Sequence, residues 1–155
     1  MGLSVEFYAG DPEEIGDAFT EIELEGLRDG SFAHSYADLS LHLSLTDFDV
    51  FSKEVGETLG RSSVLLLESL ERCVGGTPDE SEAFVVSSPW VAAVAGVPSE
   101  AATALTTRWL QAVAAESGED VVIDSPDASA AVSSLIALCR ELLARNTSVV
   151  FAWYL

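Results

Sequence analysis

Leu3-Ser4-Val5-Glu6-Phe7-Tyr8, followed closely by Asp11-Pro12-Glu13-Glu14-Ile15, is the stretch that decides the fold of this chain. Apolar and polar residues mostly alternate in the first block, which is typical of a half-buried β-strand. In the second block the aspartate suits a helix N-cap and the proline suits the first helical position. The pattern therefore predicts a strand over residues 3–8 that is followed directly by a short helix through Phe19.

Further strands are predicted downstream. Residues 39–45, Leu-Ser-Leu-His-Leu-Ser-Leu, alternate strictly, so that four leucines share one face and the polar residues share the other. Residues 84–86 form a short apolar run, and residues 121–123 are a candidate for another. Residues 148–155 are apolar on both faces, which is typical of a central strand that is covered on each side.

Helical spacing of apolar residues, with cap, proline or glycine signals at the ends, predicts four further helices over residues 46–59, 90–96, 99–118 and 125–145. Residues 62–74 are compatible with a strand or a helix, and the spacing of Leu66, Leu70 and Cys73 favours a helix. Residues 21–34, which are acidic at first and contain two glycines, are expected to be irregular.

The order of these elements indicates an α+β protein. We expect a small mixed sheet of about four strands with helices mainly on one face. The chain has 155 residues, of which 48% are hydrophobic, and this is enough to bury a substantial core. No linker-like composition separates its parts, so residues 1–155 are expected to form a single domain.

The charge of the chain is strongly negative. It has 26 Asp plus Glu against 7 Lys plus Arg, a net charge of -19, and Lys53 is its one lysine. Residues 1–60 hold 14 of the acids and 2 of the bases, a net charge of -12. Such a surface repels nucleic acid phosphates and anionic membranes and attracts basic proteins. We therefore expect a basic protein as partner, and no binding to nucleic acid or membranes.

The sequence also predicts a compartment. The longest apolar runs, residues 91–97 and 149–155, are far shorter than the roughly 20 residues that span a bilayer, and the first residues lack the basic region of a signal peptide. Cys73 and Cys139 do not form the pattern of a secreted disulfide framework, and Cys139 lies in the apolar stripe of the last predicted helix. These features predict a soluble cytoplasmic protein.

The two histidines are candidates for metal binding or catalysis. His34, Asp38 and His42 are spaced by four residues, which on one helix would align them for zinc. In a strand, however, residues four apart are separated by about 13 Å and do not converge on a metal. His42 with a carboxylate such as Asp38 is then the candidate general base, and Ser40 and Ser44 share its predicted face. A Ser–His pair without a strained turn that exposes the nucleophile is insufficient to predict catalysis.

Asp47-Phe48-Asp49 is the candidate metal-binding pair. Its two carboxylates could hold a divalent cation, but both lie in the first turn of a predicted helix capped by Thr46, where carboxylates are favoured by the partly positive helix end. A further acidic stretch, residues 116–127, lacks the ligand spacing of a calcium loop. The chain contains no glycine-rich phosphate loop, and we predict no cofactor.

Several segments resemble the YfbM-like family, which consists of bacterial proteins of unknown function. The similar segments are the opening strand and Asp-Pro-Glu-Glu-Ile helix start, the 39–45 segment with its following helix, the 89–110 region, and the long last helix with the closing strand. Residues 61–88 show no such likeness. The resemblance implies a soluble α+β fold, and it transfers no site residues because the family has no established activity.

These observations lead to three hypotheses. The leading hypothesis is a non-catalytic acidic protein-binding module, immunity-like or inhibitor-like, that docks a basic partner, because charge complementarity raises association rates and selects partners. The first alternative is a small hydrolase-type enzyme with a site near His42. The second alternative is that the acidity reflects only a high-salt environment, in which excess acid keeps a protein soluble.

Overall fold

The described part of the chain contains a five-stranded antiparallel sheet. The computed structural model describes residues 3–117 and 126–155, and within them the strand order is β2-β1-β5-β4-β3. All neighbouring strands pair antiparallel. The strands are β1 (Ser4–Gly10), β2 (Ser35–Asp38), β3 (Leu70–Gly75), β4 (Ser81–Val86) and β5 (Ser148–Tyr154).

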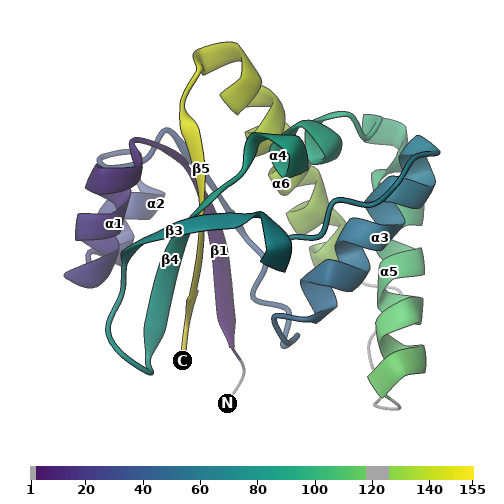
Figure 1. The fold of residues 1–155 in the computed structure, drawn as a ribbon, viewed down its shortest axis with the longest axis horizontal. Helices are drawn as coiled ribbons and strands as arrows, with labels where there is room; N and C mark the ends of the chain where they lie inside the picture. The colour runs from purple at the N-terminus through teal and green to yellow at the C-terminus, as the bar shows by residue number, and fades with distance from the viewer. Residues whose placement is uncertain (1–2, 118–125) are drawn as a thin grey trace.

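Helices cover both faces of this sheet (Figure 1). On one face lie α1 (Pro12–Thr20) and α2 (Leu24–Arg28). On the other face lie α3 (Asp47–Leu59), α4 (Ser88–Ala95), α5 (Ala102–Ser117) and α6 (Pro126–Arg145). Two 3₁₀ helices, η1 (Leu67–Ser69) and η2 (Ser99–Ala101), precede β3 and α5. The fold is α+β, as the sequence predicts.

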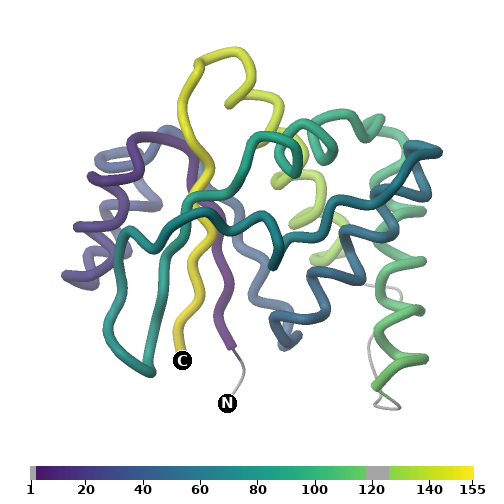
Figure 2. The backbone as a smooth tube through the Cα atoms, viewed as in Figure 1, coloured from purple at the N-terminus to yellow at the C-terminus, as the bar shows by residue number. Residues whose placement is uncertain are grey.

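β1 and β5 pair at the centre of the sheet although they lie far apart in the sequence (Figure 2). Their register runs from Ser4 opposite Tyr154 to Gly10 opposite Ser148. Because helices lie over both faces, every residue from Val5 to Gly10 is buried. β1 is therefore covered on both faces and is not the half-buried strand that the alternation predicts. The predicted central position of the last strand is confirmed.

Aromatic rings dominate the larger core, between the sheet and α3–α6. The Phe7 ring stacks on Trp90 with centroids 5.6 Å apart, and it lies 5.2 Å from the ring of Phe151. Phe48 contacts both Phe7 and Trp109. Such ring pairs add to the stabilisation that comes from burying the area. A smaller core on the opposite face joins the sheet to α1 and α2 through Tyr8, Ile15, Phe19, Leu27 and Val150.

Local end signals were reliable predictors of the helices. The Asp11 carboxylate accepts a hydrogen bond of 3.0 Å from the Glu14 N–H, so Asp11 caps α1 as predicted. α3 ends at Gly60, whose φ of 67° places it in the left-handed region that glycine adopts readily. α6 is followed by Asn146 with a φ of 53°. The four downstream helices predicted from periodicity correspond to α3, α4, α5 and α6.

The strand predicted over residues 39–45 is wrong. The observed strand, β2, ends at Asp38, and the segment that follows forms turns. The Leu39 N–H still bonds to the Val5 carbonyl, but the Leu41 N–H bonds to Leu39, and His42 has a φ of 60°. The leucines nevertheless pack on the larger core. Their alternation therefore reflects burial of an irregular segment and not a ladder of paired strands.

Three other expectations are corrected. The helix favoured over residues 62–74 is wrong, because this segment forms η1 and then β3, which pairs with β4 through two register shifts. This adds a fifth strand, and all four strand pairs are antiparallel, whereas the sequence predicts a mixed sheet of about four strands. Residues 21–34, expected to be irregular, contain α2. The candidate strand at residues 121–123 lies outside the described residues.

Candidate functional site

Asp38 and His42, the candidate catalytic pair, are both exposed and do not contact each other through a hydrogen bond or ion pair. The Asp38 carboxylate accepts a hydrogen bond of 2.9 Å from the Ser40 N–H. His42 makes no hydrogen bond or ion pair with any residue in the described ranges. The strand spacing used to separate His34 from His42 does not apply, because residues 39–45 form no strand. Ser40 instead bonds through its hydroxyl to the backbone of Val5.

Asp47 and Asp49, the candidate metal pair, lie in the first turn of α3 and accept hydrogen bonds from different backbone segments. One Asp47 oxygen accepts from the Ser44 N–H at 2.8 Å, and one Asp49 oxygen accepts from the Leu67 N–H at 3.0 Å. Thr46, expected to cap this helix, makes no side-chain cap bond. Among residues 3–117 and 126–155, no group of three His, Cys, Asp or Glu side chains could hold a metal ion.

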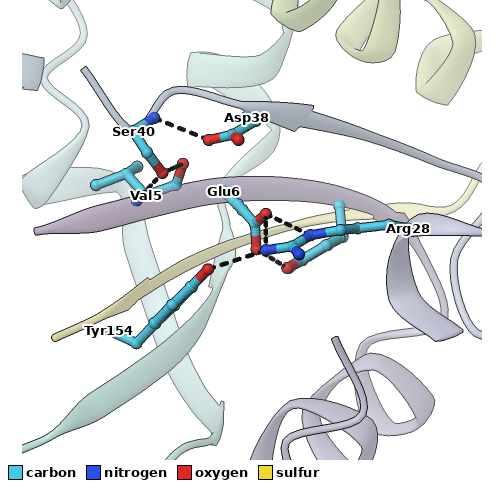
Figure 3. Close-up of polar contacts among 7 residues, drawn as sticks. Val5, Glu6, Arg28, Asp38, Ser40 and Tyr154 are labelled. Carbon is cyan, nitrogen blue, oxygen red and sulfur yellow. Dashed lines mark hydrogen bonds and ion pairs between the residues drawn. The ribbon is translucent and has the colours of Figure 1, made fainter. Parts of the chain in front are cut away.

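A buried carboxylate that sequence reasoning missed lies at the centre of the sheet. Glu6 in β1 has no exposed surface, and its Oε1 accepts a hydrogen bond of 2.8 Å from Arg28 Nε. Arg28 Nη2 lies 2.6 Å from the same oxygen and donates to the Tyr154 hydroxyl at 2.9 Å (Figure 3). The Tyr8 hydroxyl donates to the other carboxylate oxygen, Oε2. We call these four residues the Glu6 cluster.

The sheet register explains how the Glu6 cluster forms. Glu6 and Tyr8 are two residues apart on β1, so they share the face that α1 and α2 cover. Glu6 lies opposite Ala152, whose small side chain leaves room for the carboxylate, and Tyr154 lies two pairs further along the same two strands, opposite Ser4. Arg28 is the last residue of α2. The alternation of apolar and polar residues along β1 predicts that Glu6 faces solvent. Its carboxylate is buried because α1 and α2 cover that side of the strand.

The electrostatics of the cluster favour a neutral phenol beside a charged pair. Burial raises the pKa of Tyr8 well above its usual range, and the hydrogen bond and charge of Glu6 raise it further. Partial burial lowers the pKa of Arg28, but the charge of Glu6 and its hydrogen bond outweigh this effect, so the net pKa is raised. Both oxygens of Glu6 accept hydrogen bonds from internal donors. A general base must lie within reach of the substrate, and Glu6 has no exposed surface, so this arrangement serves to attach α2 to the sheet.

The two cysteines have different environments. Cys139 is buried in α6, and burial raises the pKa of its thiol, as expected for an unreactive core residue. Cys73 is exposed on β3. Neither cysteine forms a disulfide.

Exposed acids gather on the helical layer above the Glu6 cluster. Between Asp11 and Asp29 all eight acidic residues are exposed: Asp11, Glu13, Glu14, Asp17, Glu21, Glu23, Glu25 and Asp29. The one basic residue in this range, Arg28, is paired with Glu6. Hydrogen bonds from Ser31 lower the pKa of Asp29. We call residues 11–29 the acidic layer, because its surface carboxylates have almost no neighbouring positive charge.

Comparison of the chain with protein-family models, with curated proteins and with solved structures found no match. In the ranges that the structure describes, no helix combines the length and the apolar composition needed to cross a membrane.

Proposed function

We propose that this protein is a non-catalytic binding module, immunity-like or inhibitor-like, that docks a basic partner protein through the acidic layer. The observation that carries the proposal is the concentration of eight exposed carboxylates on residues 11–29, where the one basic residue is engaged by Glu6 and only Glu13 pairs with a cation from outside, Arg72. A patch of one sign attracts a partner of the opposite sign and raises its association rate. The layer is attached to the sheet by a charged pair, so it presents these charges on a rigid support.

An exposed isoleucine in the middle of the acidic layer supports the same proposal. Ile22 is 74% exposed and lies between Glu21 and Glu23, where α1 ends. Its N–H bonds to the Phe19 carbonyl, and the Glu23 N–H bonds to the Ala18 carbonyl. These two bonds form a Schellman motif, in which the residue at the position of Ile22 adopts a left-handed conformation.

Isoleucine is sterically unfavourable in this left-handed backbone conformation. Ile22 has a φ of 60°, a conformation that is rare for a β-branched side chain. The other helix ends of this kind carry Gly60 after α3 and Asn146 after α6, which adopt it readily. The chain thus keeps an exposed apolar side chain at a strained position surrounded by acids. This combination favours a contact residue, because neither solubility nor helix stability accounts for it.

Capture and charge reversal test the proposal. The immobilised protein is used to capture proteins from its source cell, the bound protein is identified, and its affinity is measured from about 0.05 to about 0.5 M salt. We expect a basic protein whose affinity falls with salt. Reversing three acidic-layer charges, Asp17→Lys, Glu21→Lys and Glu25→Lys together, should weaken binding by about tenfold or more.

A matched variant reverses three exposed acids elsewhere, Glu68→Lys, Glu71→Lys and Glu100→Lys. It should change affinity by only about two- to threefold, because it alters the net charge equally but leaves the acidic layer intact. Equal losses in both variants, or binding that is insensitive to salt, would contradict the proposal. A fold that unfolds unless strong salt is present would instead support the high-salt hypothesis.

The resemblance to YfbM-like proteins and a cytoplasmic location are further proposals that accompany this one, and both rest on the sequence features described above.

A further inference from the structure

A hollow beside the end of α3 combines apolar walls with positive charge. Its volume is ≈ 270 Å³, and it lies between α3, residues 61–64 and α4. The apolar walls are Val55, Leu59, Val64, Pro89, Ala92 and Ala93. An adjoining surface depression of ≈ 480 Å³ shares Gly56, Arg61 and Ser62 with the hollow and adds Lys53, Glu57 and Ser63. Small-molecule sites typically have this composition, with apolar walls and a few polar groups at the mouth.

Lys53 and Arg61 are unusual among the cations of this chain. Of its 7 Lys and Arg residues, four form ion pairs with carboxylates: Arg28, Arg72, Arg108 and Arg145. Arg140 donates to the carbonyls of Ala95 and Val97 and to the Ser99 hydroxyl. The side chains of Lys53 and Arg61 make no hydrogen bond or ion pair with any residue that the structure describes. The two cations without partners thus line the same depression.

The hollow is already formed by the fold. Ser52 at its floor accepts hydrogen bonds from Trp90 Nε1 and from the Leu66 N–H. Residues 61–63 pack so closely on α3 that a Cβ at Gly56 would lie 2.7 Å from the Ser63 Oγ and 3.0 Å from the Arg61 carbonyl. A ligand therefore enters a shape that needs little rearrangement, which favours binding.

Helix electrostatics do not account for both cations. The C-terminal end of α3 is partly negative and favours one cation nearby, which accounts for Arg61. Lys53 lies six residues before the last residue of the helix, well over one turn away, where this effect has faded. Glu57 lies in the same depression without pairing with Lys53 or Arg61. Both exposed cations thus line a depression in which no carboxylate of the described residues pairs with them.

We propose that this hollow binds a small aliphatic carboxylate, with the chain against the apolar walls and the carboxylate between Arg61 and Lys53. The serine hydroxyls of residues 62 and 63 are available to donate to the same carboxylate. The site lies on the α3 and α4 side of the sheet, away from the acidic layer, so it does not depend on the proposed docking function.

Calorimetric titration of the full chain with octanoate tests the proposal. We expect saturable binding with a dissociation constant of about 0.1–1 mM. Octanamide keeps the chain but lacks the charge, and acetate keeps the charge but lacks the chain; each should bind at least about tenfold more weakly. Amide chemical shifts should change around residues 61–63 and 92–93 and not in the acidic layer.

Variants of exposed charged residues test the proposal with little risk of unfolding, and a variant at the half-buried Ala93 tests the apolar wall. Arg61→Gln should weaken octanoate binding roughly tenfold, and Glu57→Gln should tighten it by about two- to threefold because an opposing charge is removed. Ala93→Phe, which fills the hollow, should abolish binding. Arg145→Gln, an exposed cation on α6, is the matched control and should have no effect. Equal affinity for octanoate and octanamide, an unchanged affinity in Arg61→Gln, or no saturable binding up to about 10 mM would overturn the proposal.

Discussion

Arg28 Nε and Nη2 both lie within 2.8 Å of a single oxygen, Oε1 of Glu6, on a carboxylate that has no contact with solvent. The two residues are 22 positions apart and come from α2 and β1. The only cation of the acidic layer therefore points inward, toward the sheet. This pairing has two effects: it holds the short helix α2 in place, and it leaves the surface of the layer predominantly negative, with Glu13 paired to Arg72 of β3.

Breaking this pair should destabilise the fold strongly. Glu6→Gln removes the charge that Arg28 and Tyr8 bind, and we expect a loss of about 3 kcal/mol in the free energy of unfolding, measured by urea denaturation. Arg28→Met should cost a similar amount because it leaves the buried carboxylate unpaired. In the double variant the two losses should be clearly non-additive. The control is Glu13→Gln, whose exposed pair with Arg72 should contribute less than about 1 kcal/mol. Similar losses at Glu6 and Glu13 would contradict this account.

Alkaline pH should destabilise the protein through Tyr8. The pKa of Tyr8 is raised in the folded state, whereas in the unfolded state it is near the ordinary value for tyrosine, about 10. Folding thus favours the neutral phenol of Tyr8. Its contribution to the free energy of unfolding is complete below pH 10. Above that pH the unfolded chain loses the proton first, so stability should fall by about 1.4 kcal/mol per pH unit for this residue.

Urea denaturation at several alkaline pH values measures that slope. Tyr8→Phe should remove it, although the variant is less stable at neutral pH because Glu6 loses a donor. Tyr36→Phe, which leaves Tyr8 in place, should keep it. A slope that is unchanged in Tyr8→Phe would show that other groups cause the alkaline loss.

Relieving the backbone strain at Ile22 should increase the stability of the fold and weaken binding of the partner. Ile22→Gly should raise the free energy of unfolding by about 1 kcal/mol, since glycine adopts the left-handed conformation without a steric penalty. The same variant should weaken binding of the basic partner, because the exposed apolar contact is lost. Leu143→Asn, at a 59% exposed position inside α6, is a control that should not weaken binding. An Ile22→Gly variant that is less stable than the native chain would contradict the proposed strain at this position.

Adding a methyl group at Gly16, as in Gly16→Ala, should destabilise the fold. Helix propensity alone predicts that Gly16→Ala in α1 stabilises the chain by about 1 kcal/mol. However, a Cβ at this position would overlap the Val74 carbonyl of β3, so α1 would have to move off the sheet. We expect a net loss of about 2 kcal/mol in urea denaturation. Asp17→Ala, one residue along and exposed, should show no such loss, and a stabilised Gly16→Ala would show that α1 has room to shift.

Local patterns predicted those elements whose signals are contained within a few residues. Asp11 and Pro12 mark the start of α1, and Gly60 marks the end of α3, because caps act through hydrogen bonds and φ angles of the adjacent backbone. The β5 segment was predictable because burial on both faces leaves a continuous apolar run.

Tertiary contacts decided the elements that were predicted wrongly. Leu66, Leu70 and Cys73 have helical spacing within residues 62–74, but pairing with β4 makes residues 70–75 a strand. Residues 39–45 have strand spacing, but the backbone turns at His42. Glu6 occupies a polar position of an alternating strand, and its burial depends on α2, whose formation no local pattern predicted. The proposed carboxylate site could not be predicted from the sequence either, because Lys53, Arg61 and Ala93 come together only when α3 packs near α4.

The strand order also has a consequence for synthesis in the cell. β5 lies between two strand pairs, β1 with β2 and β3 with β4, and it is the only strand that joins them within the described sheet. Translation makes β5 about 140 residues after β1. Until residues 148–154 leave the ribosome, the edges of both pairs stay open and the rings of Phe7 and Tyr8 lack their cover. The nascent chain must therefore keep these strand edges protected from aggregation until β5 has been made, and only then can the sheet close.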